Sequence, residues 1–114
     1  MHAPSVSLLP PGPPRTATFI GPDVYSPGFS AMILVVDITS AGTGSITVSL
    51  QGKDPNGIYY PLVQGGPYTT VSTNVTNVNI ISSNVMLPPV WRIVVTHNNP
   101  NPMIYSVSYA LGNL

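Results

Sequence analysis

From Thr16 onward, β-branched and aromatic residues alternate with polar ones, and clusters of Gly, Pro and Asn interrupt this alternation at intervals of about 8–12 residues. A period of two places alternate side chains on opposite faces of a strand, whereas a helix needs apolar residues every three or four positions. No stretch of the chain shows the helical period together with helix caps. The pattern predicts an all-β fold, a single antiparallel β-sandwich of seven or eight short strands with little or no helix.

The alternation is clearest in residues 45–51, where Ile46, Val48 and Leu50 face one way and hydroxyl groups face the other. Residues 32–39 are apolar on both faces, which predicts a central strand covered on both sides. The remaining predicted strands span residues 16–20, 58–63, 68–72, 75–81, 91–96 and 103–111.

Three turn-forming clusters suggest how these strands connect. Residues 41–44 predict a tight hairpin between the strands at 32–39 and 45–51, and residues 98–102 predict a hairpin between the last two strands. Residues 54–57, with the sequence DPNG, place Pro and Gly where a turn needs a fixed φ and then a positive φ.

Residues 1–14 form a separate region before the predicted domain at residues 15–114, because they hold five of the fourteen prolines. Proline fixes φ and lacks an N–H, so this region favours an extended conformation. It is either a frayed terminus or an arm that docks on a neighbouring protein, and its apolar side chains favour the arm. The residues expected to form this partner-binding arm are Val6, Leu8, Leu9, Pro10, Pro11, Pro13 and Pro14.

Ionisable side chains are scarce in this chain of 114 residues, which is the size of one domain. Charged residues make up 5% of the sequence, the formal net charge is zero, and there is neither Glu nor Cys. Without a cluster of Lys and Arg, the chain has no basis for binding nucleic acid or an anionic membrane surface. The absence of Cys excludes disulfides, a thiolate zinc site and a cysteine nucleophile.

Few residues could carry out chemistry. His2 lies in the expected arm and His97 at the end of a predicted strand, so neither is placed to work with an Asp and a Ser. We therefore expect a protein that is not an enzyme and that uses no cofactor, metal or small-molecule substrate.

Asp37 and Arg92 are charges inside otherwise apolar predicted strands. An unpaired charge there would cost several kcal/mol, so we expect these two residues to form a structural ion pair. Lys53, the backbone or water are the alternative partners.

The edges of the predicted sheets lack the Lys and Glu residues that usually prevent strands of different molecules from pairing. Low charge also weakens repulsion between copies. A homo-oligomer or a subunit of a larger assembly is therefore expected rather than a free monomer.

Several short strings occur in a fixed order between residues 15 and 110: RTA at 15–17, GPDVYSPG at 21–28, VVDIT at 35–39, SLQGKDP at 49–55, YY at 59–60, WRI at 91–93 and YSV at 105–107. In this order the sequence resembles small β-sandwich proteins encoded among the virion structural genes of tailed bacteriophages. The Pro-rich arm is outside the resemblance.

The resemblance implies a capsid decoration or cement protein that binds across neighbouring major capsid protein subunits on the outer surface of the virion, after assembly in the host cytoplasm. The alternative is a carbohydrate- or receptor-binding module of a tail or fibre. Its aromatic anchors would be Trp91, Tyr25, Tyr59, Tyr60, Tyr68, Tyr105 and Tyr109.

Overall fold

The computed structural model describes residues 6–10, 12, 14–40, 44–62, 68–71, 77–83 and 87–112, with the backbone alone for 39, 40, 68–71 and 77–83. These residues contain no helix, and therefore none that could cross a membrane. Their ten strands are β1 (Val6–Leu9), β2 (Phe19–Ile20), β3 (Val24–Tyr25), β4 (Ala31–Ser40), β5 (Ser45–Lys53), β6 (Tyr59–Pro61), β7 (Tyr68–Val71), β8 (Asn77–Ser83), β9 (Val90–His97) and β10 (Ile104–Gly112).

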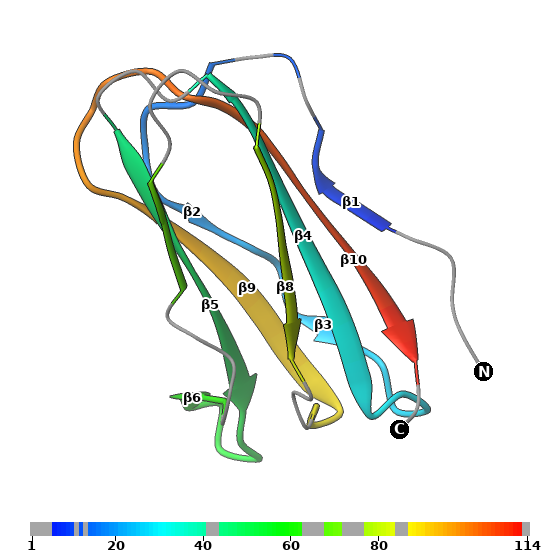
Figure 1. Ribbon diagram of the computed structural model, residues 1–114. Coiled ribbons are helices and arrows are strands. Elements are labelled where there is room, and N and C mark those ends of the chain that lie inside the picture. Colours follow the sequence, from blue (N-terminus) through cyan, green and yellow to red (C-terminus); the bar gives the residue numbers. More distant parts are fainter. Residues whose placement is uncertain are drawn as a thin grey trace.

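The strands form two antiparallel sheets that face each other (Figure 1). One sheet has the order β1-β10-β4-β8. In the other, the order is β2-β9-β5-β6, with β3 also paired to β9 and β7 also paired to β5. This arrangement confirms the predicted all-β sandwich.

Two edges of the second sheet are each built from two short strands. β2 and β3 pair with successive parts of β9, and β6 and β7 pair with opposite ends of β5. The ten strands therefore occupy eight strand positions. Each of the eight predicted strands is present, and β1 and β3 are additional.

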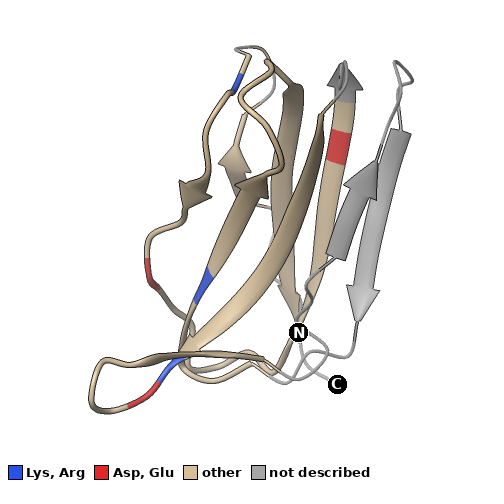
Figure 2. Cartoon of the chain, turned by 90° about the vertical axis from the view of Figure 1, so that its left-hand side faces the viewer, with Lys and Arg blue, Asp and Glu red and all other residues tan. Residues whose placement is uncertain are grey.

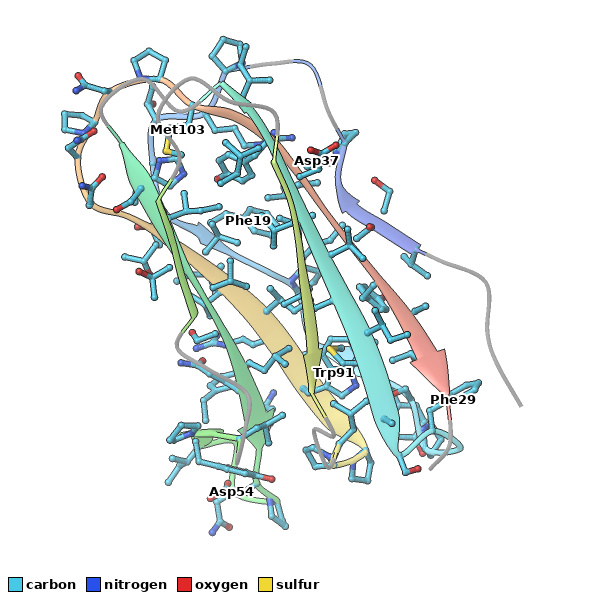
Figure 3. The ribbon with its side chains drawn as sticks, in the orientation of Figure 1. Phe19, Phe29, Asp37, Asp54, Trp91 and Met103 are labelled. Atoms are coloured by element: carbon cyan, nitrogen blue, oxygen red, sulfur yellow. The ribbon has the colours of Figure 1, made fainter. Side chains whose placement is uncertain are left out.

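The core lies between the sheets and follows the period-two pattern. β5, β9 and β10 bury every second side chain along most of their length. Trp91 is fully buried (Figure 3). Its indole ring meets Tyr109 edge-on at 5.2 Å between centroids, and its Nε1–H donates to Ser26 Oγ at 2.7 Å. The buried apolar residues are Leu9, Met32, Leu34, Val36, Ile38, Ile46, Val48, Leu50, Leu62, Leu87, Trp91, Ile93, Val95, Met103, Tyr105, Val107, Tyr109 and Leu111.

Two predicted hairpins are wrong. β4 and β5 belong to different sheets, and so do β9 and β10. The chain therefore crosses from one sheet to the other after β4 and again after β9; residues 41–43 lie outside the described residues. Turn-forming residues indicate where a chain reverses, but they do not specify whether it returns within the same sheet.

β4 is central, between β10 and β8, but the prediction that it is covered on both sides is wrong. Met32, Leu34 and Val36 are buried against the other sheet, whereas Ile33 on the opposite face is 49% exposed. The outward apolar residues of β4 are thus part of the molecular surface.

Candidate protein-binding face

The outward side chains of β9 form the middle of a surface that combines apolar, aromatic and charged groups. Val90, Arg92 and Val94 alternate with the buried Trp91, Ile93 and Val95, so they point away from the core. Residues of β2, β3 and β5 that pair with β9 extend this surface on both sides of the strand. The surface, here called the β9 face, comprises Ile20, Asp23, Tyr25, Gln51, Lys53, Tyr59, Val90, Arg92 and Val94.

Two side chains of the β9 face are unusually exposed for apolar or aromatic residues. Ile20 lies opposite Val94 and is 59% exposed, and Tyr25 lies opposite Val90 and is 73% exposed. Both belong to the short strands at the sheet edge. Each therefore offers apolar area that a partner could cover.

Arg92 is held in place by two neighbours. Its Nε donates to Gln51 Oε1 at 2.8 Å, and its guanidinium carbon lies 3.4 Å from the centroid of the Tyr59 ring. Gln51 lies directly opposite Arg92 across the β5–β9 pair. This stacking restricts the guanidinium group, so less conformational entropy would be lost when a partner binds it.

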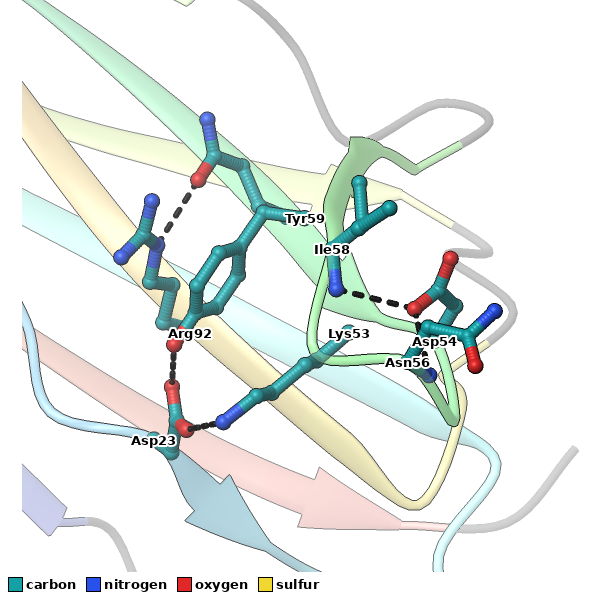
Figure 4. A network of polar contacts seen from close by, with 8 residues as sticks. Asp23, Lys53, Asp54, Asn56, Ile58, Tyr59 and Arg92 are labelled. Atoms are coloured by element: carbon teal, nitrogen blue, oxygen red, sulfur yellow. Dashed lines mark hydrogen bonds and ion pairs between the residues drawn. The ribbon is translucent and has the colours of Figure 1, made fainter.

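Asp23 joins Tyr59 and Lys53 in a polar network (Figure 4). Tyr59 Oη donates to one carboxylate oxygen at 2.5 Å, and Lys53 Nζ donates to the other at 2.8 Å. The hydrogen bond from Lys53, and then that from Tyr59, lowers the pKa of Asp23. The carboxylate in turn raises the pKa of Lys53, so both groups are charged at neutral pH.

The β5–β6 turn fixes the positions of Lys53 and Tyr59, which lie opposite each other. Asp54 Oδ1 accepts hydrogen bonds from the backbone N–H groups of Asn56 and Ile58, each at 2.9 Å. Gly57 has a φ of 82°, which confirms the predicted turn and its need for glycine.

Charge is sparse over the chain, and it is concentrated near this face (Figure 2). Asp23, Lys53 and Arg92 belong to the β9 face, and Asp54 lies in the adjoining turn. Tyr and Arg are enriched at the energetically important positions of protein interfaces. Lys and Asp are depleted there, so the Tyr and Arg residues of the β9 face, and not its ion pair, make it a candidate protein-binding surface.

No family model and no curated protein matches the sequence. Among solved structures, a chain of "Structure of infectious bursal disease virus Gt strain" matches with a TM-score of 0.46 and 12% sequence identity. The match covers 96% of the present chain and 30% of that chain, so the present chain spans less than a third of its length.

The predicted ion pair between Asp37 and Arg92 is wrong. Asp37 lies on the outward face of β4 in one sheet, and Arg92 on the outward face of β9 in the other, so the sandwich core separates them. Within the described ranges, the only ion pair joins Lys53 and Asp23, at 2.8 Å. Asp37 Oδ1 is buried without a hydrogen-bond partner among those residues.

The predicted partner-binding arm is corrected in part. Val6–Leu9 form β1, which pairs with β10 of the same chain. Leu9 is 8% exposed in the domain's own core, and Leu8 packs against it, so neither is free to enter a neighbour's groove in this conformation. Pro10 and Pro14 are exposed, and Pro11 and Pro13 lie outside the described residues.

The aromatic residues divide between core and surface. Trp91, Tyr105 and Tyr109 are buried, Tyr25 and Tyr60 are exposed, and the side chain of Tyr68 lies outside those described. In the part of the chain that the structure describes, no group of three or more His, Asp, Glu or Cys side chains could hold a metal ion.

Sequence reasoning missed the network of Asp23, Tyr59 and Lys53. Asp23 is 30 positions from Lys53 and 36 from Tyr59, and no local pattern links them. The available signal was the short DPNG turn after Lys53, which predicts that the chain returns at once and brings residue 59 beside it.

Proposed function

We propose that this protein is a structural subunit of a tailed-bacteriophage virion, a capsid decoration or cement protein that binds across neighbouring major capsid protein subunits. The observation that carries this proposal is the β9 face, with exposed Ile20 and Tyr25 around a positioned Arg92. Large apolar side chains on a rigid sheet lose little entropy on binding, which suits a protein that acts by contact alone.

The proposed stabilisation of the shell would come from the same contact made many times. Each copy would bury a modest area across a junction between shell subunits, and the same contact would recur at every equivalent junction. A ligand that binds the assembled shell more tightly than its separate subunits stabilises the shell by mass action. Cohesion against the pressure of packaged DNA would rise without any chemical step.

Low charge supports the same role. A formal net charge of zero gives little long-range repulsion between neighbouring copies on a crowded surface. The proposed location is the outer capsid surface, reached after assembly in the host cytoplasm, and the proposed partners are the major capsid protein and further copies of this chain.

The test is binding of the purified protein to empty shells of the major capsid protein encoded with it. Tyr25→Ala should weaken binding at least tenfold, or about 1.4 kcal/mol, because it removes the most exposed aromatic side chain of the β9 face. Ile33→Ser is the matched control, since it removes an exposed apolar side chain from the opposite sheet and should leave binding unchanged.

The outcomes of this experiment test the location of the binding surface and the decoration role separately. Loss of binding in Ile33→Ser with normal binding in Tyr25→Ala would move the contact to the other sheet. Failure of the wild-type protein to bind shells or to appear in an electron-microscopy map of the particle would overturn the decoration role.

The second candidate is a carbohydrate- or receptor-binding module of a tail or fibre. The exposed Tyr25 and the neighbouring Tyr59 with its carboxylate partner Asp23 are the observation in its favour. Trp91, Tyr105 and Tyr109 are buried and cannot serve as sugar-stacking anchors. Glycan-array binding that is lost in Tyr25→Ala, with no binding to shells, would select this candidate.

A further inference from the structure

Arg92 has hydrogen-bond donors that the protein itself does not use. Within the described residues its guanidinium makes one hydrogen bond, from Nε to Gln51 Oε1, which leaves Nη1 and Nη2 without an acceptor there (Figure 4). Both atoms reach solvent, since the buried side-chain atoms without a partner in that part of the chain are Asp37 Oδ1 and His97 Nδ1. The edge of the guanidinium group that carries Nη1 and Nη2 is therefore free to bind a ligand.

The neighbours of Arg92 restrict how an acceptor can approach it. The Tyr59 ring covers one face of the guanidinium at 3.4 Å, and Gln51 occupies the edge that carries Nε. Tyr59 is held in turn by its hydrogen bond to Asp23. An acceptor therefore approaches Nη1 and Nη2 in the plane of the guanidinium, which is the geometry in which Arg binds both oxygens of a carboxylate.

Arg92 also carries the uncompensated charge of the β9 face. Asp23 and Lys53 form an ion pair at 2.8 Å, so their charges cancel. The hydrogen bond from Lys53 has the largest effect in lowering the pKa of Asp23, and the charge of Arg92 has the smallest. The carboxylate of Asp23 is thus neutralised chiefly by Lys53, and one positive charge of the face remains at Arg92.

Apolar side chains flank Arg92 along the strand. Val90 and Val94 lie two residues before and after it, so they are about 6–7 Å away along β9. Tyr25 lies opposite Val90, and Ile20 lies opposite Val94. A partner that covers both apolar pairs excludes water from Arg92, and a charge interaction becomes stronger when water is excluded.

We propose that Arg92 binds the side-chain carboxylate of an Asp or Glu residue of the partner protein, through Nη1 and Nη2. Apolar groups on either side of that acidic residue cover Val90 with Tyr25 and Val94 with Ile20. The inference rests on the function proposed above, because it names the chemistry of the partner at the same face.

A carboxylate fits this site better than a phosphate group does. A carboxylate has one negative charge, which equals the remaining charge of the face, whereas a phosphate group carries about −1.5 to −2 at neutral pH. Asp23 belongs to the same network through Tyr59, and its carboxylate repels a ligand more strongly as the negative charge of the ligand increases. The geometry and the charge therefore favour the same ligand.

The first test measures binding of purified variants to empty shells of the major capsid protein encoded with this chain. Arg92→Gln should weaken binding roughly tenfold or more, because it leaves the partner's carboxylate without its paired donors. Arg92→Lys should fall between Arg92→Gln and the wild type, because it keeps the charge but cannot bind both oxygens in one plane.

The double variant Asp23→Asn/Lys53→Gln is the matched control. It removes one charge of each sign, so the net charge of the face is unchanged, and Asn can still accept the hydrogen bond of Tyr59. Its affinity for shells should stay within roughly threefold of the wild type. Thermal denaturation checks that each variant is folded.

The second test uses the wild-type protein and does not depend on the folding of a variant. An electron-microscopy map of shells with the protein bound should place an Asp or Glu carboxylate of the capsid protein at about 3 Å from Nη1 and Nη2 of Arg92. Replacing that acidic residue by Lys should abolish binding of the wild type, and Arg92→Glu should restore it.

The outcomes distinguish this inference from the proposed function. Wild-type protein that binds shells with no Asp or Glu at Arg92, or Arg92→Gln that binds as tightly as the wild type, would overturn the carboxylate contact and leave the decoration role intact. Wild-type protein that does not bind shells would overturn both.

Discussion

At the scale of single residues, buried polar atoms decide how much individual substitutions cost. Trp91 Nε1–H has its hydrogen-bond partner in Ser26, which is 6% exposed. His97 Nε2 has a partner in the Tyr105 hydroxyl at 2.6 Å, but His97 Nδ1 is buried with none among the described residues. The hydrogen bond between Trp91 and Ser26 is therefore tested by substitution, and the site at His97 by a change of pH.

Ser26→Ala should destabilise the protein by about 1–3 kcal/mol, because it leaves the buried indole N–H of Trp91 without an acceptor. Urea denaturation measures the free energy of unfolding. In a Trp91→Phe background, which has no indole N–H, Ser26→Ala should cost clearly less. An equal cost in both backgrounds would contradict the importance of this hydrogen bond.

His97 should make the protein less stable as the pH falls below neutral. Burial, and then the charge of Arg15, lower the pKa of His97 from its ordinary value of 6.5. The unfolded chain therefore binds more protons between the folded pKa and 6.5, and stability is lost as the pH falls through that interval. Urea midpoints should drop between pH 7 and pH 5.

His97→Gln is the matched variant for this pH dependence, because Gln can keep a hydrogen bond to Tyr105 Oη but cannot be protonated. Its urea midpoint should change less over the same pH range. Asp23 does not affect this comparison of urea midpoints. Its pKa lies below the ordinary 3.8, so its contribution to the free energy of unfolding is lost only in stronger acid.

At the scale of strands, two glycines mark places where elements approach closely. A Cβ on Gly21 would lie 2.7 Å from the backbone oxygen of Ile93, at the junction where β2 and β3 meet β9. A Cβ on Gly52 would lie 2.6 Å from Tyr60 Cζ and 2.9 Å from Leu62 Cδ2, which are side-chain atoms. Backbone cannot move aside as easily as a side chain.

Gly21→Ala should therefore destabilise the protein by roughly 1–3 kcal/mol, and Gly52→Ala by less, because the Tyr60 ring is partly exposed and can shift. Gly28→Ala, in open space, should stay within about 0.5 kcal/mol of the wild type. Thermal denaturation ranks the three variants, and a larger effect at Gly52 than at Gly21 would contradict this explanation.

At the scale of the whole molecule, one outer surface is almost without charge. Outward positions of β4 and β10 carry Ile33, Val35, Ser106, Ser108 and Ala110 around the single charge of Asp37. Few charges and zero net charge weaken repulsion between molecules. Self-association through this surface is the expected consequence at high concentration.

Ile33→Lys should raise solubility at pH 7, because it adds a charge at a side chain that is 49% exposed. The free energy of unfolding should stay within about 0.5 kcal/mol of the wild type. Ile33→Ser separates the effect of charge from that of apolar area. Light scattering that is equally low for Ser and Lys would assign the association to apolar contact alone.

The sequence was sufficient for the faces of the strands. Residues Ile46, Val48 and Leu50, and Met103 to Leu111 at every second position, are buried as their alternation predicts. The same rule located eight strands, and the Pro and Gly of the DPNG sequence located the turn at residues 54–57. The candidate site was less predictable, because Asp23, Tyr59 and Arg92 meet only through the pairing of β3, β5, β6 and β9.

Local sequence thus determined which side of each strand is buried, because side-chain direction depends on a period of two within one strand. The tertiary structure alone decided which strands pair, and so it separated β4 from β5, parted Asp37 from Arg92, and placed Leu9 in the core. Strand pairing depends on contacts between residues far apart along the chain, and the free energy of those contacts must offset the entropy lost in bringing distant segments together, which no local pattern records.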